Sequence, residues 1–238
     1  MTRPGSGVQL EAVRPGPPAL ERLAELVDAA QSTDPLAPVT VVVPTNYAGL
    51  AVRRTLAAHR ARAAVSFVTV NRLAEELAGP RLAEGGRRPV STPLIAAAVR
   101  RVLDTEAGMF APVAAHPSTE RALVRAHREL AGLDETALDT LADASRRARE
   151  VVRLHRAVHA LLEPRFTDEH DLLAAAIERA ADPATDLTTT GEIVVYLPRR
   201  LAPAAGRLLA TLGRRLGVTV LVGATGDPHA DTLVGAVA

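Results

Sequence analysis

One run of residues, Val39–Val43, constrains the fold of this chain more than any other feature. Every position in it is apolar or β-branched, so it lacks the alternation that marks a strand with one face in water. A strand of this kind is typical of a parallel sheet covered by helices on both faces. The chain breaks just before it at Pro35–Pro38, and a helical pattern with Leu50, Val52 and Leu56 follows it.

Strand and helix patterns alternate on either side of this run. Val8–Val13 predicts a first strand, and a helical stripe begins at Leu20. Val65–Val70 predicts a further strand, followed by a short helix that ends at Gly79-Pro80. A second group, over Gly191–Asp227, contains the strand EIVVYL, a helix and the strand VTVLV. Such alternation implies right-handed crossovers and a doubly wound sheet.

The hydrophobic period between these two groups is helical throughout. We expect four helices, with starts at Thr92-Pro93, at Ser118, at Asp134 or Glu135 (this one reaching about Leu162) and at Asp168. The predicted organisation is one α/β domain in two halves, over 1–84 and 183–238, with a helical insertion over 85–182.

Composition excludes several classes of protein. A formal net charge of +1 argues against a protein that coats a polyanion, although a local basic groove stays open. The absence of cysteine excludes a disulfide framework and cysteine-based zinc sites or nucleophiles. The apolar runs are too short to span a bilayer and the amino terminus has no apolar signal core, so we expect no membrane partner and a cytoplasmic location. Two tyrosines, three phenylalanines and no tryptophan make an aromatic base-stacking platform unexpected.

Five segments, taken in order, carry a resemblance to a known family. They are the turn Arg14–Ala19, VVVPTNYAGLAVRRTLAAH at 41–59, VSFVTVNRLAEELAG at 65–79, FTDEHDLLAAAIERA at 166–180, and Gly226-Asp227-Pro228. Together they resemble the first motor domain of superfamily 1 helicases of the UvrD and RecB type. The resemblance is closest to AddB-like and RecB-like helicase–nucleases whose ATPase motifs are degenerate. It implies a RecA-like doubly wound parallel sheet, P-loop NTPase-like but degenerate, with an inserted all-helical subdomain.

The resemblance implies that the ATP chemistry is missing. A phosphate-binding loop needs a lysine, and the chain contains none. Gly16 alone remains of the loop's glycines, and the two prolines that follow it lack amide donors. Tyr196 and Leu197 stand where the family has an acidic pair for magnesium, and Arg199-Arg200 follow them. Asp227 belongs to the next motif, in which Ala230 replaces a glutamine.

In this family the segments 41–59 and 65–79 face the path of single-stranded DNA. The resemblance therefore predicts six DNA-contacting residues, namely Thr45, Asn46, Arg53, Arg54, Asn71 and Arg72. An N-cap followed by a solvated helix face explains the same residues without a ligand. Arg199 and Arg200 likewise suit either pairing with local acids or contact with a polyanion.

Two clusters could be interpreted as metal sites, although each has a simpler interpretation. Asp168–Asp171 contains three acids and a histidine, but adjacent residues in a first helical turn point in different directions, and acids there complement the helix dipole. His155, His159 and Glu163 share one helix face beside an apolar stripe, which favours packed or half-exposed histidines. We expect no metal, no cofactor and no catalytic residue in this segment.

The leading interpretation is an ATPase-inactive, helicase-like scaffold that guides DNA within a DNA repair and recombination protein. Its expected partners are weakly bound single-stranded DNA, a nuclease region of the same chain beyond Ala238, and a motor helicase subunit. On this interpretation the parent protein is an exonuclease, whereas this segment is not itself an enzyme. One alternative is a stand-alone α/β enzyme that uses Thr45, Thr225 and Asp227 at the strand ends. Another is a protein-interaction domain whose helical insertion binds a partner.

Overall fold

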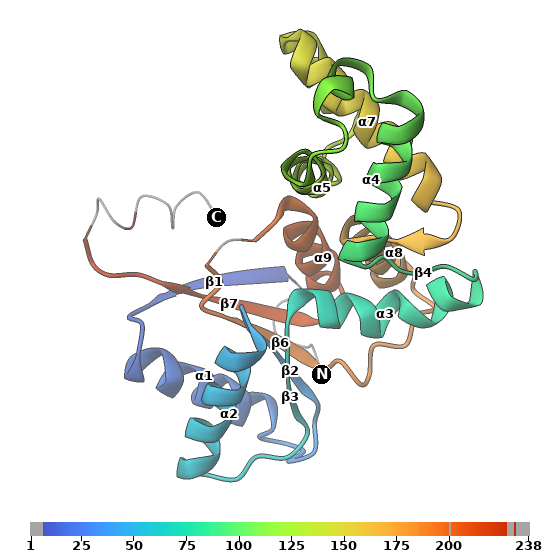
Figure 1. Cartoon of the computed structure of the whole chain (residues 1–238). Helices are drawn as coiled ribbons and strands as arrows, with labels where there is room; N and C mark the ends of the chain where they lie inside the picture. Colours follow the sequence, from blue (N-terminus) through green and yellow to red (C-terminus); the bar gives the residue numbers. More distant parts are fainter. Residues whose placement is uncertain (1–6, 200, 228–230, 232–238) are drawn as a thin grey trace. The chain divides into compact units, whose positions relative to one another are not determined.

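The computed structural model describes residues 7–199, 201–227 and 231 of the chain (Figure 1). Its contacts divide the chain into two compact units. The first, here called the α/β unit, comprises 1–78 and 173–238, and the second, the helical unit, comprises 79–172. The predicted insertion over 85–182 is therefore longer at its carboxyl end than the helical unit, because most of the helix over 169–181 belongs to the α/β unit.

A five-stranded parallel sheet forms the centre of the α/β unit. The strand order is β1-β7-β6-β2-β3, with β1 at Gly7–Val13, β2 at Val39–Val42, β3 at Val65–Val68, β6 at Glu192–Tyr196 and β7 at Gly217–Gly223. The register aligns Val39 of β2 with Val65 on one side and with Glu192 on the other. All four residues of β2 are buried, as the run without alternation predicted. The prediction that EIVVYL shares a sheet with the first group of strands is also confirmed.

Helices cover both faces of this sheet. One face packs against α1 (Pro17–Ala30) and α2 (Asn46–His59), and α9 (Pro203–Gly213) packs against β1 and β7 on the other (Figure 1). The core on the first side contains Leu23 and Val27 of α1 against Val39, Val41 and Leu221. On α9 the buried stripe is Leu208, Leu209 and Leu212. The sheet is thus doubly wound, because connections from neighbouring strands pass to opposite faces.

The helix α3 (Val70–Glu84) departs from the sequence-based expectation in both its limits. The strand before it ends at Val68 rather than Val70, since Thr69 turns the chain and accepts a hydrogen bond from the amide of Arg72. The helix also continues through Pro80, where a stop was predicted. A proline inside a helix removes one backbone donor, and the remaining turns can still form when their other hydrogen bonds are made.

The helical unit contains four α-helices, one 3₁₀ helix and a two-stranded parallel pair among the residues described. The bounds are α4 at Thr92–Glu106, η1 at Gly108–Val113, α5 at Pro117–Leu130, α6 at Glu135–Ala144, α7 at Arg146–Leu162, β4 at Arg88–Pro89 and β5 at Phe166–Thr167. The prediction of an all-helical unit is therefore wrong in this respect, because β4 and β5 pair. The core lies where α4, α5 and α7 meet, around Val99, Leu123 and Val158.

Two helix starts in this unit differ from prediction. The single long helix expected up to Leu162 is broken into α6 and α7 at Ser145, which is extended and whose hydroxyl accepts a hydrogen bond from the amide of Ala148 at 3.1 Å. The cap of α5 is His116 rather than Ser118, because the ring of His116 accepts the Ser118 amide at 3.2 Å. Asp134 caps α6 as expected.

Every helix within the described ranges is too short or too polar to cross a lipid bilayer.

The loop before β6 supplies a test of the α/β unit. Gly191 has a φ of +62°, and a Cβ atom added there would collide with the carbonyl group of Pro38. The left-handed conformation alone costs an L-residue about 1–2 kcal/mol. We therefore predict that Gly191→Ala lowers the free energy of unfolding by about 2–4 kcal/mol in urea titrations followed by circular dichroism.

The matched control is Gly206→Ala in α9, where an added Cβ meets nothing within 4 Å. Because alanine is the better helix former, this change should stabilise the protein by about 0.5–1 kcal/mol. Equal effects of the two substitutions would contradict the described path of the chain at Gly191.

Candidate functional site

The sheet gathers the predicted site residues at one edge, where its parallel strands end. The three strands that precede the predicted degenerate nucleotide residues, β1, β6 and β7, are neighbours in the order β1-β7-β6. The strands that precede the two predicted DNA segments, β2 and β3, follow directly in the same order. Carboxyl ends of parallel strands are where open α/β sheets bind ligands. The residues predicted for a degenerate nucleotide site and those predicted for DNA contact therefore follow adjoining strands.

The start of α1 is poor in donors for a phosphate. Gly16 is its N-cap, with a φ of +99°, and Pro17 and Pro18 occupy the first helical positions. A helix normally offers four free amide N–H groups at its start, and the two prolines remove two of them. Side-chain capping is also absent there. Anion binding at a helix start depends on these amides, so this one is a weak anion site.

Apolar side chains lie beside the carboxyl end of β7. A Cβ atom placed on Gly223, at the end of β7, would lie 3.3 Å from Cγ of Pro15 and 3.5 Å from Cδ2 of Leu197. Both side chains are therefore close to Gly223. Tyr196 is buried in the core, and burial raises the pKa of its hydroxyl. The carboxyl end of β6 thus presents neither of the carboxylates that would hold a magnesium ion.

Leu197 has an unusual backbone conformation for its residue type. Its φ is +46°, in the left-handed region, and its amide donates to the carbonyl oxygen of Leu221 at 3.0 Å. Its side chain packs on the same core cluster that contains Tyr196. A left-handed leucine costs about 1–2 kcal/mol, which this hydrogen bond and the packing offset.

The loop after β7 satisfies its own donors with a carboxylate. Asp231 accepts hydrogen bonds from the amides of Thr225 and Gly226, both at 2.8 Å, and from the Thr225 hydroxyl at 2.9 Å. The hydrogen bond from the Thr225 amide contributes most to lowering the pKa of Asp231. Asp227 is exposed, and its amide donates to the Thr225 hydroxyl oxygen. Arg200 and Ala230, which the sequence analysis also singled out, lie outside the described residues.

The first predicted DNA segment forms an exposed face on α2. Thr45 caps the helix by accepting the Ala48 amide at 3.1 Å, and Asn46 beside it is exposed. Arg53 and Arg54 are exposed, and neither guanidinium group has an ion pair or hydrogen bond among the described residues. The structure therefore leaves two guanidinium groups on this face without a carboxylate partner among those residues.

Sequence reasoning missed two further residues of this face. Tyr47 is 88% exposed and Leu50 is 42% exposed. Both follow from the helix geometry, because Gly49, Val52 and Leu56 are the buried positions and Tyr47 lies on the other side. Counting aromatic residues in the whole chain concealed this single tyrosine. We call the set Asn46, Tyr47, Leu50, Arg53 and Arg54 the α2 face.

The side chains of the second predicted DNA segment are less available to a ligand than those of α2. Arg72 pairs with Glu75 at 3.0 Å and with Glu76 at 3.1 Å, so its charge is already balanced by two acids of α3. Asn71, in the first turn of the same helix, is half-buried. The structure brings the starts of α2 and α3 to neighbouring strand ends, but of these two described helices only α2 has unpaired arginines at the predicted positions.

The two aspartates of the acidic cluster have hydrogen-bond and ion-pair partners within the protein, and the histidines of the other cluster are buried or half-buried. Asp168 and Asp171 accept each other's backbone amides at 2.8 and 3.1 Å, which caps α8 (Glu169–Ala181), and Asp171 also pairs with Arg87 at 2.8 Å. His155 is buried on α7 and His159 is half-buried. Within the described part of the chain, no three His, Asp or Glu side chains are arranged to hold a metal ion.

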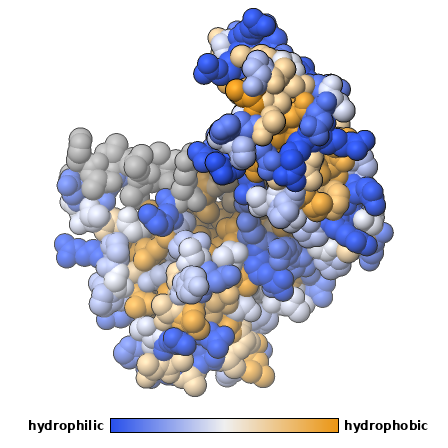
Figure 2. Space-filling model, viewed as in Figure 1, coloured by the Kyte–Doolittle hydropathy of each residue, from blue (hydrophilic) through white to orange (hydrophobic). Residues whose placement is uncertain are grey.

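Hydrophilic and hydrophobic residues are interspersed over the visible face (Figure 2). A net charge of +1 fits this mixture, so any contact with a polyanion must be local.

No protein-family model matches the chain, and no curated protein matches it in sequence.

The geometry at the start of α1 and the end of β6 predicts that the protein neither hydrolyses ATP nor binds it tightly. Lysine is absent from the chain, Pro17 and Pro18 remove amide donors, and Tyr196 and Leu197 at the end of β6 contribute no carboxylate for magnesium. We expect no magnesium-dependent phosphate release above background, with or without single-stranded DNA, and no saturable signal from a fluorescent ATP analogue. DNA-stimulated hydrolysis by pure protein that is abolished by substitution of Gly16 would disprove this.

Proposed function

We propose that this chain is an ATPase-inactive, helicase-like module that guides single-stranded DNA along the carboxyl edge of its parallel sheet. The observation that supports this best is the α2 face, where an exposed tyrosine lies on the same helix as two arginines that are unpaired among the described residues. The ends of the neighbouring strands β6 and β7 support the inactive part of the proposal, because Pro15 and Leu197 lie close to Gly223 and no carboxylate follows Tyr196. A RecA-like sheet belongs to the same proposal, since the parallel strand order is compatible with it.

Single-stranded DNA suits the α2 face for physical reasons. Exposed guanidinium groups bind phosphate oxygens, and an exposed aromatic ring can stack on a base of any sequence. The start of α2 adds backbone amides with a partial positive charge beside Asn46. Because the face contributes only Arg53 and Arg54 as cations, few phosphates are neutralised, so the affinity should be modest and salt-sensitive. In the full protein, we propose, a nuclease region and a motor subunit supply the chemistry and the force.

The enzyme alternative is less favoured by the same geometry. Two of its three candidate polar groups are already engaged, since the Thr45 hydroxyl accepts the Ala48 amide and the Thr225 hydroxyl donates to Asp231. The interaction-domain alternative predicts no binding of DNA. The binding measurement described below therefore distinguishes it from the proposed DNA-guiding role.

We predict weak binding of single-stranded DNA that depends on Arg53 and Arg54. Replacing both with alanine should weaken binding without unfolding the protein, because both side chains are exposed and without partners in the described residues. The slope of log affinity against log salt should flatten by about 0.7 for each phosphate that the variant no longer neutralises. Fluorescence anisotropy with a labelled oligonucleotide at several salt concentrations measures both quantities.

The control removes the same charge from the other face of the sheet. Arg207→Ala with Arg214→Ala changes two exposed arginines, on α9 and at its C-cap, and should leave affinity nearly unchanged. An equal weakening in both double variants would indicate a non-specific charge effect. If the unaltered protein shows no binding even at low salt, the DNA-guiding role is wrong and the interaction-domain alternative replaces it.

Tyr47 allows a prediction about base stacking, which the charges of Arg53 and Arg54 do not provide. Tyr47→Ala should weaken DNA binding by about 1–3 kcal/mol, the range for removal of one stacked base, with the salt slope unchanged. Tyr47→Phe keeps the ring and should bind like the unaltered protein. A phenylalanine variant as weak as the alanine variant would show that the ring does not stack and that the hydroxyl matters instead.

A further inference from the structure

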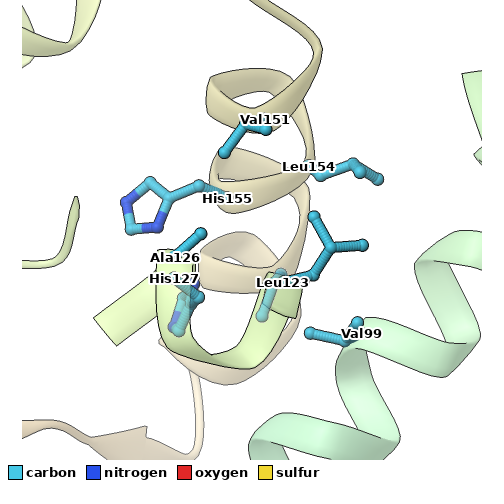
Figure 3. Close-up of a pocket in the computed structure, with 8 residues that line it drawn as sticks. Val99, Leu123, Ala126, His127, Val151, Leu154 and His155 are labelled. Carbon is cyan, nitrogen blue, oxygen red and sulfur yellow. The ribbon is translucent and has the colours of Figure 1, made fainter. Parts of the chain in front are cut away.

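Two buried histidines meet inside the helical unit. His127 of α5 is 5% exposed and His155 of α7 is 7% exposed, and their ring centroids lie 4.7 Å apart. Figure 3 shows His127 on α5 and His155 on α7 beside the apolar side chains that line the pocket between α4, α5 and α7. Buried histidines are uncommon without partners, so this pair requires a physical account.

Neither ring has its full set of hydrogen bonds. The Nδ1 atoms of His127 and His155 are both buried, and neither has a hydrogen-bond partner in the described structure. The adjoining cavity has a volume of about 10 Å³ and a largely aliphatic lining that includes Val99, Leu123 and Leu154. This volume is at the lower limit for one water molecule, and aliphatic walls offer water few partners. The pocket therefore offers a charged ring little solvation on the Nδ1 side.

The charged groups around the pair do not compensate for a proton on it. His127 is influenced by Arg128 of its own helix and by His155 and His159 of α7, all of which disfavour its cation. Around His155, His159 and Arg156 of α7 disfavour the cation, whereas Glu135 of α6 and Asp168, at the start of α8, favour it. The two acids act on His155 only, so His127 has no opposite charge among these influences.

We propose that the His127–His155 contact makes the helical unit proton-sensitive, so that protonation of the pair releases α5 from α7. Packing of α5 on α7 favours neutral rings, because burial among aliphatic side chains disfavours a cation and no acid is among the charged groups that act on His127. The unit then has a closed state in which α5 is packed and an open state in which both rings reach water. Acid shifts the population towards the open state.

The direction of the pH dependence follows from the pKa values. Burial is the main cause that lowers the pKa of His127 to about 4, from an ordinary value of 6.5, and burial also lowers the pKa of His155. The open state therefore binds more protons than the closed state, and acid favours it. The closed state has its full stability above about pH 6.5 and is progressively destabilised as the pH falls towards 4. His127 alone should raise the opening equilibrium constant about 30-fold between pH 8 and pH 5.

Peptide-resolved hydrogen exchange on the whole chain tests the proposal. Protection of amides in α5, corrected for intrinsic exchange rates, should fall about 30-fold or more between pH 8 and pH 5. His127→Leu should remove most of that fall, since leucine packs in the same site and does not titrate. His59→Leu, at the exposed end of α2, is the matched control and should leave the fall unchanged. A His127→Leu variant with the same pH dependence as the unaltered protein would overturn the proposal.

A second measurement needs no variant and stays decisive if His127→Leu does not fold. Nuclear magnetic resonance of the histidine ring protons in the unaltered protein follows each titration directly. We expect the His127 signal to keep its neutral position down to about pH 5, although α5 protection has already decreased by then, and to shift only at lower pH. Titration of His127 near pH 6.5 in a protein whose α5 stays protected would contradict the proposal.

Discussion

The hydrogen-bonded pairing of β2 with β6 is the interaction on which the rest of the α/β unit depends. The two strands are far apart in the sequence, and the register sets Val39 beside Glu192 and Val42 beside Val195. Without this ladder, β1, β6 and β7 would not share a sheet with β2 and β3, and the two groups of predicted site residues would not follow adjoining strands. Both strands are almost entirely buried, so leaving their backbone groups unpaired would cost far more than any single surface contact contributes. Thr40 reinforces the junction, because its buried hydroxyl donates to the carbonyl oxygen of Thr190 at 2.7 Å.

Regular hydrophobic patterns in the sequence were enough to predict the strands of the sheet, because the spacing of apolar residues reflects which faces of a strand are buried. The absence of alternation in β2 reflects two covered faces, and the structure has it so. Features without a pattern were missed. β4 and β5 have two residues each, too few to show any period. Apolar residues recur at helical spacing on both sides of Ser145, at Leu138, Leu141, Ala148 and Val152, so the sequence showed no break between α6 and α7. Pro80 predicted a helix end, yet one missing amide did not stop α3.

The candidate site also contains some features that the sequence predicted and others that it did not. The missing lysine, the prolines after Gly16 and the absence of acids at the end of β6 can be read from the sequence, and the family resemblance gave them their meaning. The pairing of Arg72 with Glu75 and Glu76 was also readable from their i+3 and i+4 spacing on one helix, but was not predicted. That Arg53 has no acid partner among the described residues depends on the folded structure. The contact of His127 with His155 joins two helices and has no signature that spacing could reveal.

Pro15 and Leu197, which both lie close to Gly223, bear on how the proposed module would respond to nucleotide. A motor domain works because nucleotide binds one of its conformations more tightly than another, and a ligand can shift an equilibrium only by that difference. Under the proposed function, ATP has no such difference to act on here, so we expect the strand ends to keep one geometry at every ATP concentration. The α2 face would then hold DNA in a fixed place, and any movement of the DNA would have to be driven by another part of the proposed assembly.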